Sequence, residues 1–320
     1  MRVVQIGDVA AVAPALADAL RDRAEVISIP LAQRGSHRGG AIKLLLGPLR
    51  VIDAAKVARV ARAMHPDIVH VHWVPNGIVG LMVRTPWVLH VHGSDIRDLG
   101  LLRRSPFHVL IRAASRVVYS TPDLARWVLP LRPDADYLPT PIAIRASMPD
   151  RDWDVLVASR GAASKGSAVA AAAVELLLEQ DPRLRIAAVD GPDFNARAVR
   201  LPFVSKAAFV ERLARSRVVM GQFRVPALGI SELEAMSVAR PVVTNVDLTF
   251  YKDPPPVVVA TSPQAAAVGV RRLLDAPAEA DALGLAGQRW VRAHYSPDSV
   301  GSEVLAIYRR ALDDAGTEVP

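Results

Sequence analysis

Short apolar runs rich in Val, Ile and Leu alternate along the whole chain with longer segments in which apolar residues recur at helical spacing. Such alternation is typical of parallel sheets covered by helices on both faces, so the sequence predicts an α/β fold with doubly wound sheets. The expected strands are Val3–Ile6, Glu25–Ile29, Asp67–Val71, Pro86–His92, Arg116–Tyr119, Asp136–Leu138, Asp154–Ala158, Leu184–Val189, Val218–Gln222, Pro241–Thr244 and Val257–Ala260. The expected helices are Pro14–Arg23, Val51–Met64, Arg104–Ala114, Pro122–Val128, Ser167–Glu179, Ala207–Ser216, Glu232–Val238, Pro263–Asp275, Ala278–His294 and Pro297–Asp313.

The chain divides most readily at Ile142–Trp153, a polar segment that contains a proline and follows an expected strand. A length of 320 residues also favours two hydrophobic cores over one. We therefore predict two Rossmann-like domains, residues 1–148 and 149–296. A C-terminal segment, residues 297–320, should form a helix that opens at Pro297 and could pack back on the first domain. Ligands of open α/β sheets bind beyond the carboxyl ends of the strands, so two such domains facing each other would form one cleft.

All the excess positive charge lies in the first half of the chain. The protein carries a net charge of +7 with a pI of about 10.1, and residues 1–150 contain 19 basic and 12 acidic residues. The high pI suggests a nucleic-acid binder as one alternative, but the basic half lacks interleaved aromatic residues and a recognition-helix motif, so we expect no nucleic-acid partner. The chain has no cysteine, its N-terminus does not have the pattern of a signal peptide, and no apolar run reaches the roughly 18 residues of a membrane span. These features predict a cytoplasmic protein.

A loop of small residues, Ser159–Gly166, follows the first expected strand of the second domain and contains two cations, Arg160 and Lys165. The helix that begins near Gly166 adds unpaired N–H groups and the positive end of its dipole, so the loop favours binding of a diphosphate. It does not match the Walker A pattern, because Lys165 precedes the glycine. A solvated loop with ordinary surface charges is the alternative, but Lys165 is informative because the chain has 5 lysines and 34 arginines.

A second segment, Pro226–Thr244, places two carboxylates near the start of a short expected helix. Glu232 and Glu234 lie two residues apart and therefore face different directions. One of them could accept hydrogen bonds from the two vicinal hydroxyls of a ribose. The alternative is that the acidic residues only stabilise the N-terminal end of the helix dipole.

Together the two segments resemble the C-terminal domain of the family-4 retaining glycosyltransferases, which have the GT-B fold. In that family an Arg and a Lys five residues apart bind the donor diphosphate, which is the spacing of Arg160 and Lys165, and an E-x7-E segment ends in E-A-M, as at Glu234-Ala235-Met236. Similar segments follow one another along the chain: DIVHVHW (67–73), PWVLHVHGSDI (86–96), YLPTPI (137–142) and DPPPVVVA (253–260). The resemblance implies a first domain on the acceptor side and a second domain that binds a nucleotide sugar.

The same resemblance implies an activity and a set of site residues. The activity is retaining transfer of a sugar from a nucleoside-diphosphate sugar to an unknown acceptor, without a metal and with no cofactor besides the donor substrate. By position, His92 in a His-Gly segment contacts the donor sugar. The expected catalytic residues are His92, Arg160 and Lys165, and the expected donor contacts are Gly7, Gly93, Arg160, Lys165, Gly229, Ile230, Ser231 and Glu234.

The chain departs from the family pattern in three places. The first Glu of the E-x7-E segment is replaced by Pro226, the glycine of a later C-G-x-P turn is replaced by Ala239, and an N-terminal Gly-Gly loop is reduced to Gly7. Pro226 supports a second hypothesis, a nucleotide-sugar-binding or epimerase-like GT-B protein without transferase activity.

Four histidines recur at i, i+2 spacing on two neighbouring expected strands, His70 with His72 and His90 with His92. Such pairs point to one face of a sheet and could bind a metal, but no carboxylate lies at a typical ligand spacing. We therefore interpret His70, His72 and His90 as packing or supporting residues and expect no metal site. Asp134-Ala135-Asp136 mimics a D-x-D metal motif, but it precedes a strand of the first domain and is interpreted as a loop.

Two mixed clusters in the basic half combine cations with apolar residues. The first contains Arg34, Arg38, Lys43, Arg50, Lys56, Arg59 and Arg62 around Leu44-Leu45-Leu46, Val57, Val60 and Met64, and the second contains Leu101-Leu102-Arg103-Arg104, Phe107 and Arg112. This mixture is typical of a peripheral contact with an anionic membrane, at the inner membrane face, or with a lipid-linked or acidic acceptor. Apolar residues in a helix core beside solvated arginines are an equally supported alternative.

Overall fold

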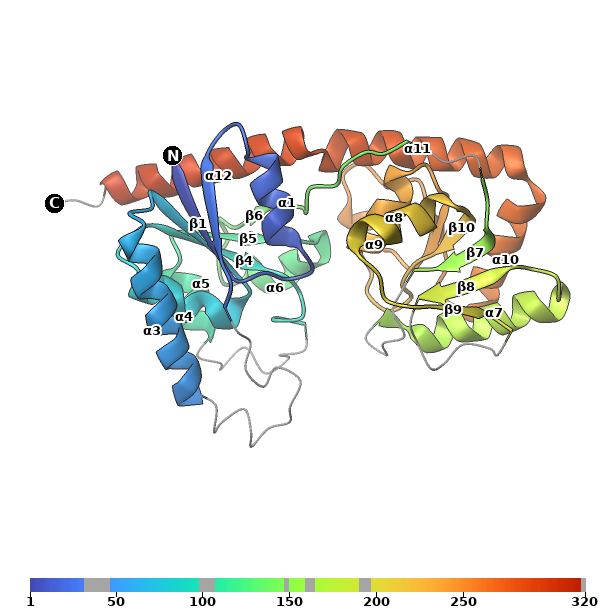
Figure 1. The fold of residues 1–320 in the computed structure, drawn as a ribbon, viewed down its shortest axis with the longest axis horizontal. Helices are drawn as coiled ribbons and strands as arrows, with labels where there is room; N and C mark the ends of the chain where they lie inside the picture. Colours follow the sequence, from blue (N-terminus) through green and yellow to red (C-terminus); the bar gives the residue numbers. More distant parts are fainter. Residues whose placement is uncertain (32–46, 98–106, 147–149, 159–164, 190–196, 318–320) are drawn as a thin grey trace. The chain divides into compact units, whose positions relative to one another are not determined.

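The computed structural model describes residues 1–31, 47–97, 107–146, 150–158, 165–189 and 197–317 (Figure 1). The chain forms two compact units, one made of Met1–Pro141 with Pro297–Pro320 and the other of Ile142–Ser296. Each unit contains a six-stranded sheet whose neighbouring strands all pair in parallel. The doubly wound α/β fold class predicted from the sequence is confirmed.

The sheet of the first unit has the strand order β2-β1-β3-β4-β5-β6. The winding of the chain reverses between β1 and β3, which makes the carboxyl ends of these two strands the switch point where ligands of such sheets bind. The strands are β1 (Arg2–Ile6), β2 (Glu25–Ile29), β3 (Ile68–His72), β4 (Trp87–Val91), β5 (Arg116–Tyr119) and β6 (Asp136–Tyr137). The helices are α1 (Val12–Ala19), α3 (Gly47–Ala63), α4 (Gly77–Met82), α5 (Phe107–Ala113), α6 (Ala125–Val128) and α12 (Pro297–Thr317), with single turns η1 (Val74–Asn76) and η3 (Pro122–Leu124).

The C-terminal helix α12 packs on the first unit beside α1, as Figure 1 shows. A Cβ on Gly301 of α12 would lie 2.6 Å from the carbonyl oxygen of Ala19 at the end of α1, so the glycine permits this close approach. Arg23 forms an ion pair of 3.1 Å with Asp298 across the same contact. Tyr308 of α12 is fully buried, so this helix contributes to the interior of the first unit.

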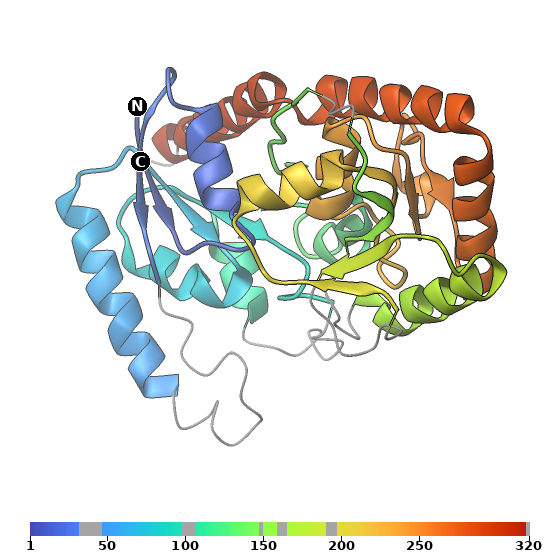
Figure 2. The same ribbon diagram turned by 45° about the vertical axis from the view of Figure 1, so that its right-hand side comes forward.

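The sheet of the second unit has the order β12-β11-β10-β7-β8-β9, the arrangement of a Rossmann fold, with its switch point between β7 and β10. Its helices lie around the strands, with α7 drawn in yellow-green in Figure 2. The strands are β7 (Trp153–Val157), β8 (Ile186–Val189), β9 (Val199–Leu201), β10 (Ser216–Met220), β11 (Val242–Thr244) and β12 (Val258–Val259). The helices are α7 (Ser167–Gln180), α8 (Lys206–Ala214), α9 (Ile230–Ser237), α10 (Pro263–Asp275) and α11 (Pro277–Tyr295), with the turn η5 (Leu248–Phe250). Residues of α7 and α10 pack on one face of the sheet, and residues of α8, α9 and α11 on the other.

The sequence pattern missed one strand and one α-helix, besides the single turns η1 and η5. The edge strand β9 is short, and its residues are exposed or only partly buried, so its apolar signal is weak. Helix α4 contains two glycines, which disfavour a helix, but Gly80 lets it pack against Trp87, where a Cβ would lie 2.3 Å from the indole ring. In both cases, packing in the folded protein overrides local preference.

The second unit begins at Ile142, seven residues earlier than the expected boundary at residue 149. Ile142 is 2% exposed within the core of the second unit, and its N–H donates to the carbonyl of Tyr295 at 2.7 Å. The first residues of the expected linker are therefore part of that core. Among the described residues, no helix combines the length and the hydropathy that crossing a membrane requires.

Candidate functional site

Lys165 and Gly166 lie at the switch point of the second sheet, beyond the carboxyl end of β7. Gly166 is the N-cap of α7 and has a φ of +74°, which favours glycine. A Cβ there would lie 2.9 Å from the backbone carbonyl carbon of Phe223, and Phe223 donates its N–H to the carbonyl of Lys165 at 2.9 Å. Lys165 and Gly166, at the end of the small-residue loop, are therefore fixed through their backbone against the segment that follows β10. Arg160, the other expected cation, lies outside the described residues.

Glu232 closes the loop that leads into α9. Its Oε2 accepts from the N–H of Gly229 at 3.0 Å and its Oε1 from the N–H of Gln222 at 2.6 Å. One carboxylate oxygen thus holds a backbone donor at the start of the helix and the other holds a donor just after β10, and Glu232 is 2% exposed. Of the two carboxylates that the sequence placed near this helix, Glu232 therefore stabilises the loop before α9.

The ammonium of Lys165 lies next to the start of α9. Its Nζ is 3.9 Å from the position that a Cβ would take on Gly229, the N-cap residue of that helix. Ile230 and Ser231 are the first two residues of α9 and are partly buried. A cation and the N–H groups of a helix N-terminus at one sheet edge form an arrangement that binds phosphate. The structure therefore brings four of the predicted residues together, Lys165, Gly229, Ile230 and Ser231.

Glu234 is the second carboxylate of this region and is nearly inaccessible, with 4% of its surface exposed. Lys206 at the start of α8 forms an ion pair with it, with 3.3 Å between Nζ and Oε1. Among the described residues, no group donates an aligned hydrogen bond to this Oε1. Burial raises the pKa of Glu234, and the charge of Lys206 opposes the shift. The carboxylate keeps the capacity to accept a hydrogen bond from a ligand.

Gly7 marks the switch point of the first sheet, at the carboxyl end of β1. Its φ of +75° lies in the left-handed region, and a Cβ there would lie 2.8 Å from Nδ2 of Asn76. Asn76 donates from the same atom to the carbonyl of His72, at the end of β3. A larger residue at position 7 would therefore disturb both the backbone and the turn after β3.

His92 and Gly93 form a turn after β4 that is held by Asp95. The buried carboxylate of Asp95 accepts from the N–H of His92 at 3.1 Å, of Gly93 at 2.7 Å and of Val74 at 3.0 Å. Burial raises the pKa of Asp95, and these backbone donors oppose that shift. Because Val74 follows β3, Asp95 fixes the ends of two neighbouring strands to each other. Asp95 was not among the residues expected from the sequence, although it follows His92 within the HGSD segment, residues 92–95.

The four histidines stack on one face of the first sheet. Ring centroids are 4.6 Å apart for His70 and His72 and 4.2 Å apart for His90 and His92, with interplanar angles of 16° and 27°. Val69, Val71, Leu89 and Val91 alternate with them and point to the other face, where α3 packs, whereas Tyr308 of α12 contacts His70 at 2.6 Å. Burial lowers the pKa of His72 to about 3 and, helped by the neighbouring rings, those of the other three well below 6.5.

Ligand atoms of His70, His72 and His90 lie within 4.8 Å of one another, which is close enough for one metal ion to contact all three. Nε2 of His70 is 3.2 Å from Nδ1 of His90, a hydrogen-bond distance. The facing nitrogens of His70 and His90 are therefore engaged with each other, which suits a hydrogen-bond chain better than convergence on one ion. The expectation that these histidines are supporting residues stays the preferred interpretation.

Asp134 and Asp136, the two acids of the D-x-D-like sequence, pair with arginines. Asp134 contacts Arg132 at 2.9 Å and Arg116 at 3.5 Å, and Asp136 contacts Arg310 of α12 at 2.8 Å. Hydrogen bonding to Arg132 lowers the pKa of Asp134 to about 2. The ion pairs with Arg116 and Arg310 attach strand β6 and its preceding turn to the rest of the first unit.

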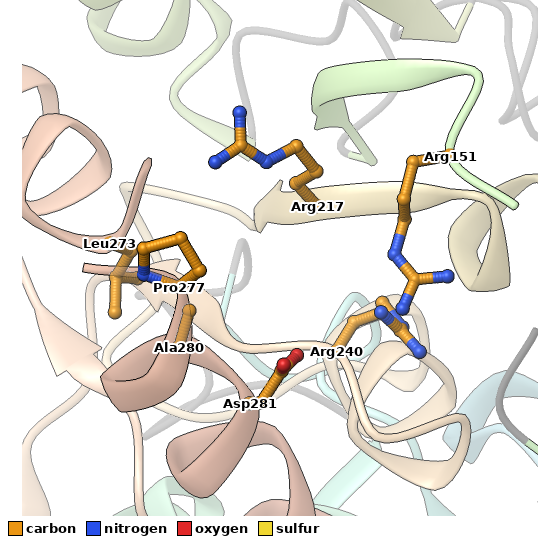
Figure 3. A pocket seen from close by; sticks show the side chains of 7 residues that line it. All are labelled: Arg151, Arg217, Arg240, Leu273, Pro277, Ala280 and Asp281. Atoms are coloured by element: carbon orange, nitrogen blue, oxygen red, sulfur yellow. The ribbon is translucent and has the colours of Figure 1, made fainter. Parts of the chain in front are cut away.

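A pocket of about 260 Å³ lies at the opposite, amino edge of the second sheet, where Arg151, Arg217 and Arg240 precede or begin strands (Figure 3). Arg217 is paired with Asp154 at 3.3 Å. Burial and the charge of Arg151 lower the pKa of Arg240 to about 10, whereas Asp281 opposes the shift. Carboxylates thus accompany the arginines, and the pocket is separate from the switch-point residues.

The sequence matches two protein-family models, a glycosyl transferase 4-like domain over residues 5–139 and a glycosyl transferase-like domain over residues 168–306. No curated protein matches it significantly.

Several solved structures are similar over almost the whole chain. Anabaena HepE in complex with UDP and glucose has a TM-score of 0.73 at 16% identity, covering 96% of this chain and 99% of its own. Sucrose-phosphate synthase from Thermosynechococcus elongatus has a TM-score of 0.72 at 17% identity, with 98% and 100% covered. A UDP-forming α,α-trehalose-phosphate synthase from Burkholderia xenovorans has a TM-score of 0.71 at 14% identity, with 96% and 98% covered.

Two Rossmann-like units and the matched domains define the class: the protein is a glycosyltransferase of the GT-B type. Within that class it belongs to the family-4-like glycosyltransferases, as its sequence motifs predicted.

Proposed function

We propose that the protein transfers a sugar from a nucleoside-diphosphate sugar to an acceptor with retention of anomeric configuration and without a divalent metal. The observation that carries this proposal is the position of Lys165, whose ammonium lies beside Gly229 at the N-terminus of α9. Breaking the anomeric bond leaves negative charge on the β-phosphate. A cation beside a helix N-terminus stabilises that charge more in the transition state than in the ground state.

Glu234 is assigned to the ribose of the nucleotide. Two vicinal hydroxyls can each donate a hydrogen bond to a carboxylate, and the carboxylate of Glu234 is held beside the ammonium of Lys206 at 3.3 Å. A hydrogen bond from a hydroxyl to a charged carboxylate is stronger than one to a neutral acceptor, so a ribose hydroxyl bound to Glu234 would stabilise the complex. Arg160 and Lys165 are assigned to the diphosphate, and His92 and Gly93, with Gly7, to the sugar, as the family resemblance implies.

UDP is the first nucleotide to test. HepE is described in complex with UDP and glucose or with UDP-glucose, and the Burkholderia synthase is described as UDP-forming. Pro226 replaces an acidic donor-sugar contact, so the sugar itself is best chosen by a binding screen of UDP-, GDP- and ADP-sugars. A ligand at 100 times its Kd should add about 2.7 kcal/mol of stability.

The binding proposal is tested with Lys165→Ala. A charge-assisted contact to phosphate contributes about 1.5–3 kcal/mol, so the variant should bind UDP at least tenfold more weakly in calorimetry. Lys252→Ala, at an exposed lysine of the same unit, is the matched control and should bind like the parent. Equal affinity of Lys165→Ala and the parent would rule out the assignment.

The transfer proposal needs a separate test. Incubation of a bound nucleotide sugar with candidate acceptors should release the nucleoside diphosphate equally well with and without EDTA. NMR of the product should show the anomeric configuration of the donor. Donor binding without transfer to any acceptor would favour the non-transferring alternative, whereas loss of activity in EDTA with recovery in manganese would contradict metal independence.

A peripheral membrane contact through α3, which would present a lipid-linked or acidic acceptor, is a second proposal. On this helix Leu49, Val51 and Ile52 are 44%, 43% and 50% exposed, and Lys56 and Arg59 are exposed beside them. Apolar side chains next to cations suit an anionic membrane surface. Val57 and Met64 of the same segment pack partly on the core, as the alternative interpretation expected. The residues 34–46 and 101–104 of the two clusters lie outside the described residues.

A further inference from the structure

Three side chains form a hydrogen-bonded chain that ends at His92. Oε1 of Gln5 lies 3.0 Å from Nε2 of His72, and Nδ1 of His72 lies 3.1 Å from Nε2 of His92. Gln5 and His72 are fully buried, whereas His92 is partly buried at the end of β4. The chain therefore connects the interior of the first sheet, on β1 and β3, to the predicted sugar-contacting residue.

The position of each hydrogen follows from the donors and acceptors available. An amide oxygen only accepts, so Nε2 of His72 must carry the hydrogen that Oε1 of Gln5 receives. Burial lowers the pKa of His72 to about 3, so the ring is neutral and has a single N–H. Nδ1 of His72 is therefore a lone-pair acceptor, and His92 must donate to it from Nε2.

The ring of His92 ends this hydrogen-bonded chain, and its Nδ1 is the one ring nitrogen left without a partner in the chain. His92 is also neutral, because burial lowers its pKa well below 6.5, so a hydrogen on Nε2 leaves a lone pair on Nδ1. Within the part of the chain that the structure describes, this Nδ1 has no hydrogen-bond partner and is not a sealed interior atom. It can accept a hydrogen bond from a hydroxyl, but it cannot donate one to an oxyanion or a carbonyl.

We propose that Gln5, acting through His72, holds His92 in the tautomer with its hydrogen on Nε2, so that Nδ1 accepts a hydrogen bond from a hydroxyl of the donor sugar. The sugar contact rests on the proposed function, but the tautomer does not. Gln5 and His72 are thus positioning residues. The site selects a sugar with a hydroxyl at the contacted carbon over the corresponding deoxy sugar.

The opposite orientation of the Gln5 carboxamide predicts the opposite protonation state for Nδ1 of His92. If the carboxamide of Gln5 were rotated by half a turn, its NH₂ would donate to His72, and His72 would donate to His92 from Nδ1. His92 would then carry its hydrogen on Nδ1 and present a donor to the ligand. A measurement of the hydrogen position on His92 therefore decides between the two patterns.

The decisive experiment is long-range ¹H–¹⁵N correlation NMR on the full chain labelled with ¹⁵N-histidine, with His92 assigned from a His92→Gln sample. The expected result is a protonated Nε2 and a bare Nδ1 at His92 without any ligand. Gln5→Met, which keeps the size but removes the acceptor, should convert the His92 signals to a mixture of tautomers. Gln5→Glu, which keeps an acceptor, should restore the parent pattern. A hydrogen on Nδ1 of parent His92, or an unchanged His92 in Gln5→Met, overturns the proposal.

A binding measurement separates this proposal from the proposed function. UDP binds through the second unit in our assignment, so Gln5→Met should bind UDP like the parent, while its preference for UDP-glucose over UDP should fall about threefold to tenfold, the contribution of one neutral hydrogen bond. An unchanged preference together with the expected tautomers would overturn the sugar contact and leave the tautomer assignment standing. The effect of Lys165→Ala on UDP binding tests the proposed function alone. It depends neither on the tautomer of His92 nor on the UDP-glucose preference of Gln5→Met. Thermal unfolding of both Gln5 variants confirms that the first unit is folded.

Discussion

Glu234 and Lys206 form an ion pair between α9 and α8, with 3.3 Å from Oε1 to Nζ, in which the carboxylate is buried and the lysine is 45% exposed. The pair keeps a charged acceptor in the interior of the second unit, where the desolvation cost is only partly offset by the lysine. Lys206 was not among the residues expected from the sequence. It lies 28 positions before Glu234, and only the packing of α8 against α9 brings the two together.

Glu234→Gln should weaken the binding of uridine and UDP by the same factor, because the ribose is common to both ligands. We expect a loss of about 1.5–3 kcal/mol, the usual range for a hydrogen bond to a charged group. Calorimetry with both ligands measures the effect. A variant that loses affinity for UDP but not for uridine would place Glu234 near the phosphates instead.

The raised pKa of Glu234 predicts a pH dependence of uridine binding. The carboxylate accepts the ribose hydroxyls, so affinity should fall as the pH drops through the raised pKa and the group becomes protonated. Uridine is the suitable probe because it has no phosphate that titrates in this range. Glu234→Gln should bind uridine weakly and without this pH dependence, and a pH dependence that persists in the variant would assign it to another group.

The four stacked histidines predict a loss of stability of the first unit below pH 6.5. Their pKa values are lowered in the folded state, so between about pH 6.5 and their folded pKa values the unfolded chain binds more protons than the folded protein. Stability is therefore fully present above pH 6.5 and falls on acidification, by about 1.4 kcal/mol per pH unit for each histidine. Urea unfolding between pH 7.5 and 5 measures the slope.

His65 provides the control for the acid effect. It is exposed and lies outside the stack, with a φ of +47° that asparagine also tolerates, so His65→Asn should leave the slope unchanged. His72→Asn should reduce the slope by one proton equivalent, in addition to lowering stability at pH 7.5. A slope that is the same in the parent and in His72→Asn would show that the stack is protonated in the folded protein.

Gly93→Ala should destabilise the first unit and disturb the turn that carries His92. The residue has a φ of +97°, and a Cβ there would lie 2.2 Å from Nη1 of Arg97, which is held by Asp123 at 2.7 Å. We expect a loss of about 1–3 kcal/mol in thermal or urea unfolding. Gly316→Ala, where a Cβ meets nothing within 4 Å in helix α12, is the matched control and should not destabilise the protein.

Contact with an anionic membrane is tested by cosedimentation with phosphatidylglycerol vesicles. Binding should fall steeply between low and moderate salt and vanish with neutral lipid, because each basic residue near an anionic surface contributes about 1 kcal/mol that salt screens. Ile52→Ser combined with Lys56→Ser should weaken binding, whereas Val268→Ser, at an exposed apolar residue of the second unit, should not. Protein that stays in the supernatant with anionic vesicles at low salt would exclude the membrane contact and make a soluble acceptor the default.

The alternation of strand and helix was sufficient to predict the class of fold, because apolar runs of strand length and helical periodicity are local properties. Strands β2 and β5 and helix α10 have the expected boundaries. The motif around Lys165 and the E-A-M segment at Glu234 likewise identified the family, since both depend on short spacings within the chain.

Only the tertiary structure decided which of these residues act together. Glu232 and Glu234 look equivalent in sequence, but the loop after β10 turns back on α9 and uses Glu232 for its own N–H groups, whereas Glu234 pairs with Lys206 of α8. Gln5 and His72 are 67 positions apart, and their hydrogen bond exists because β1 pairs with β3 at the switch point of the first sheet. Register and burial depend on the whole sheet and on α12 from the far end of the chain, so no local pattern could reveal the link between Gln5 and His92.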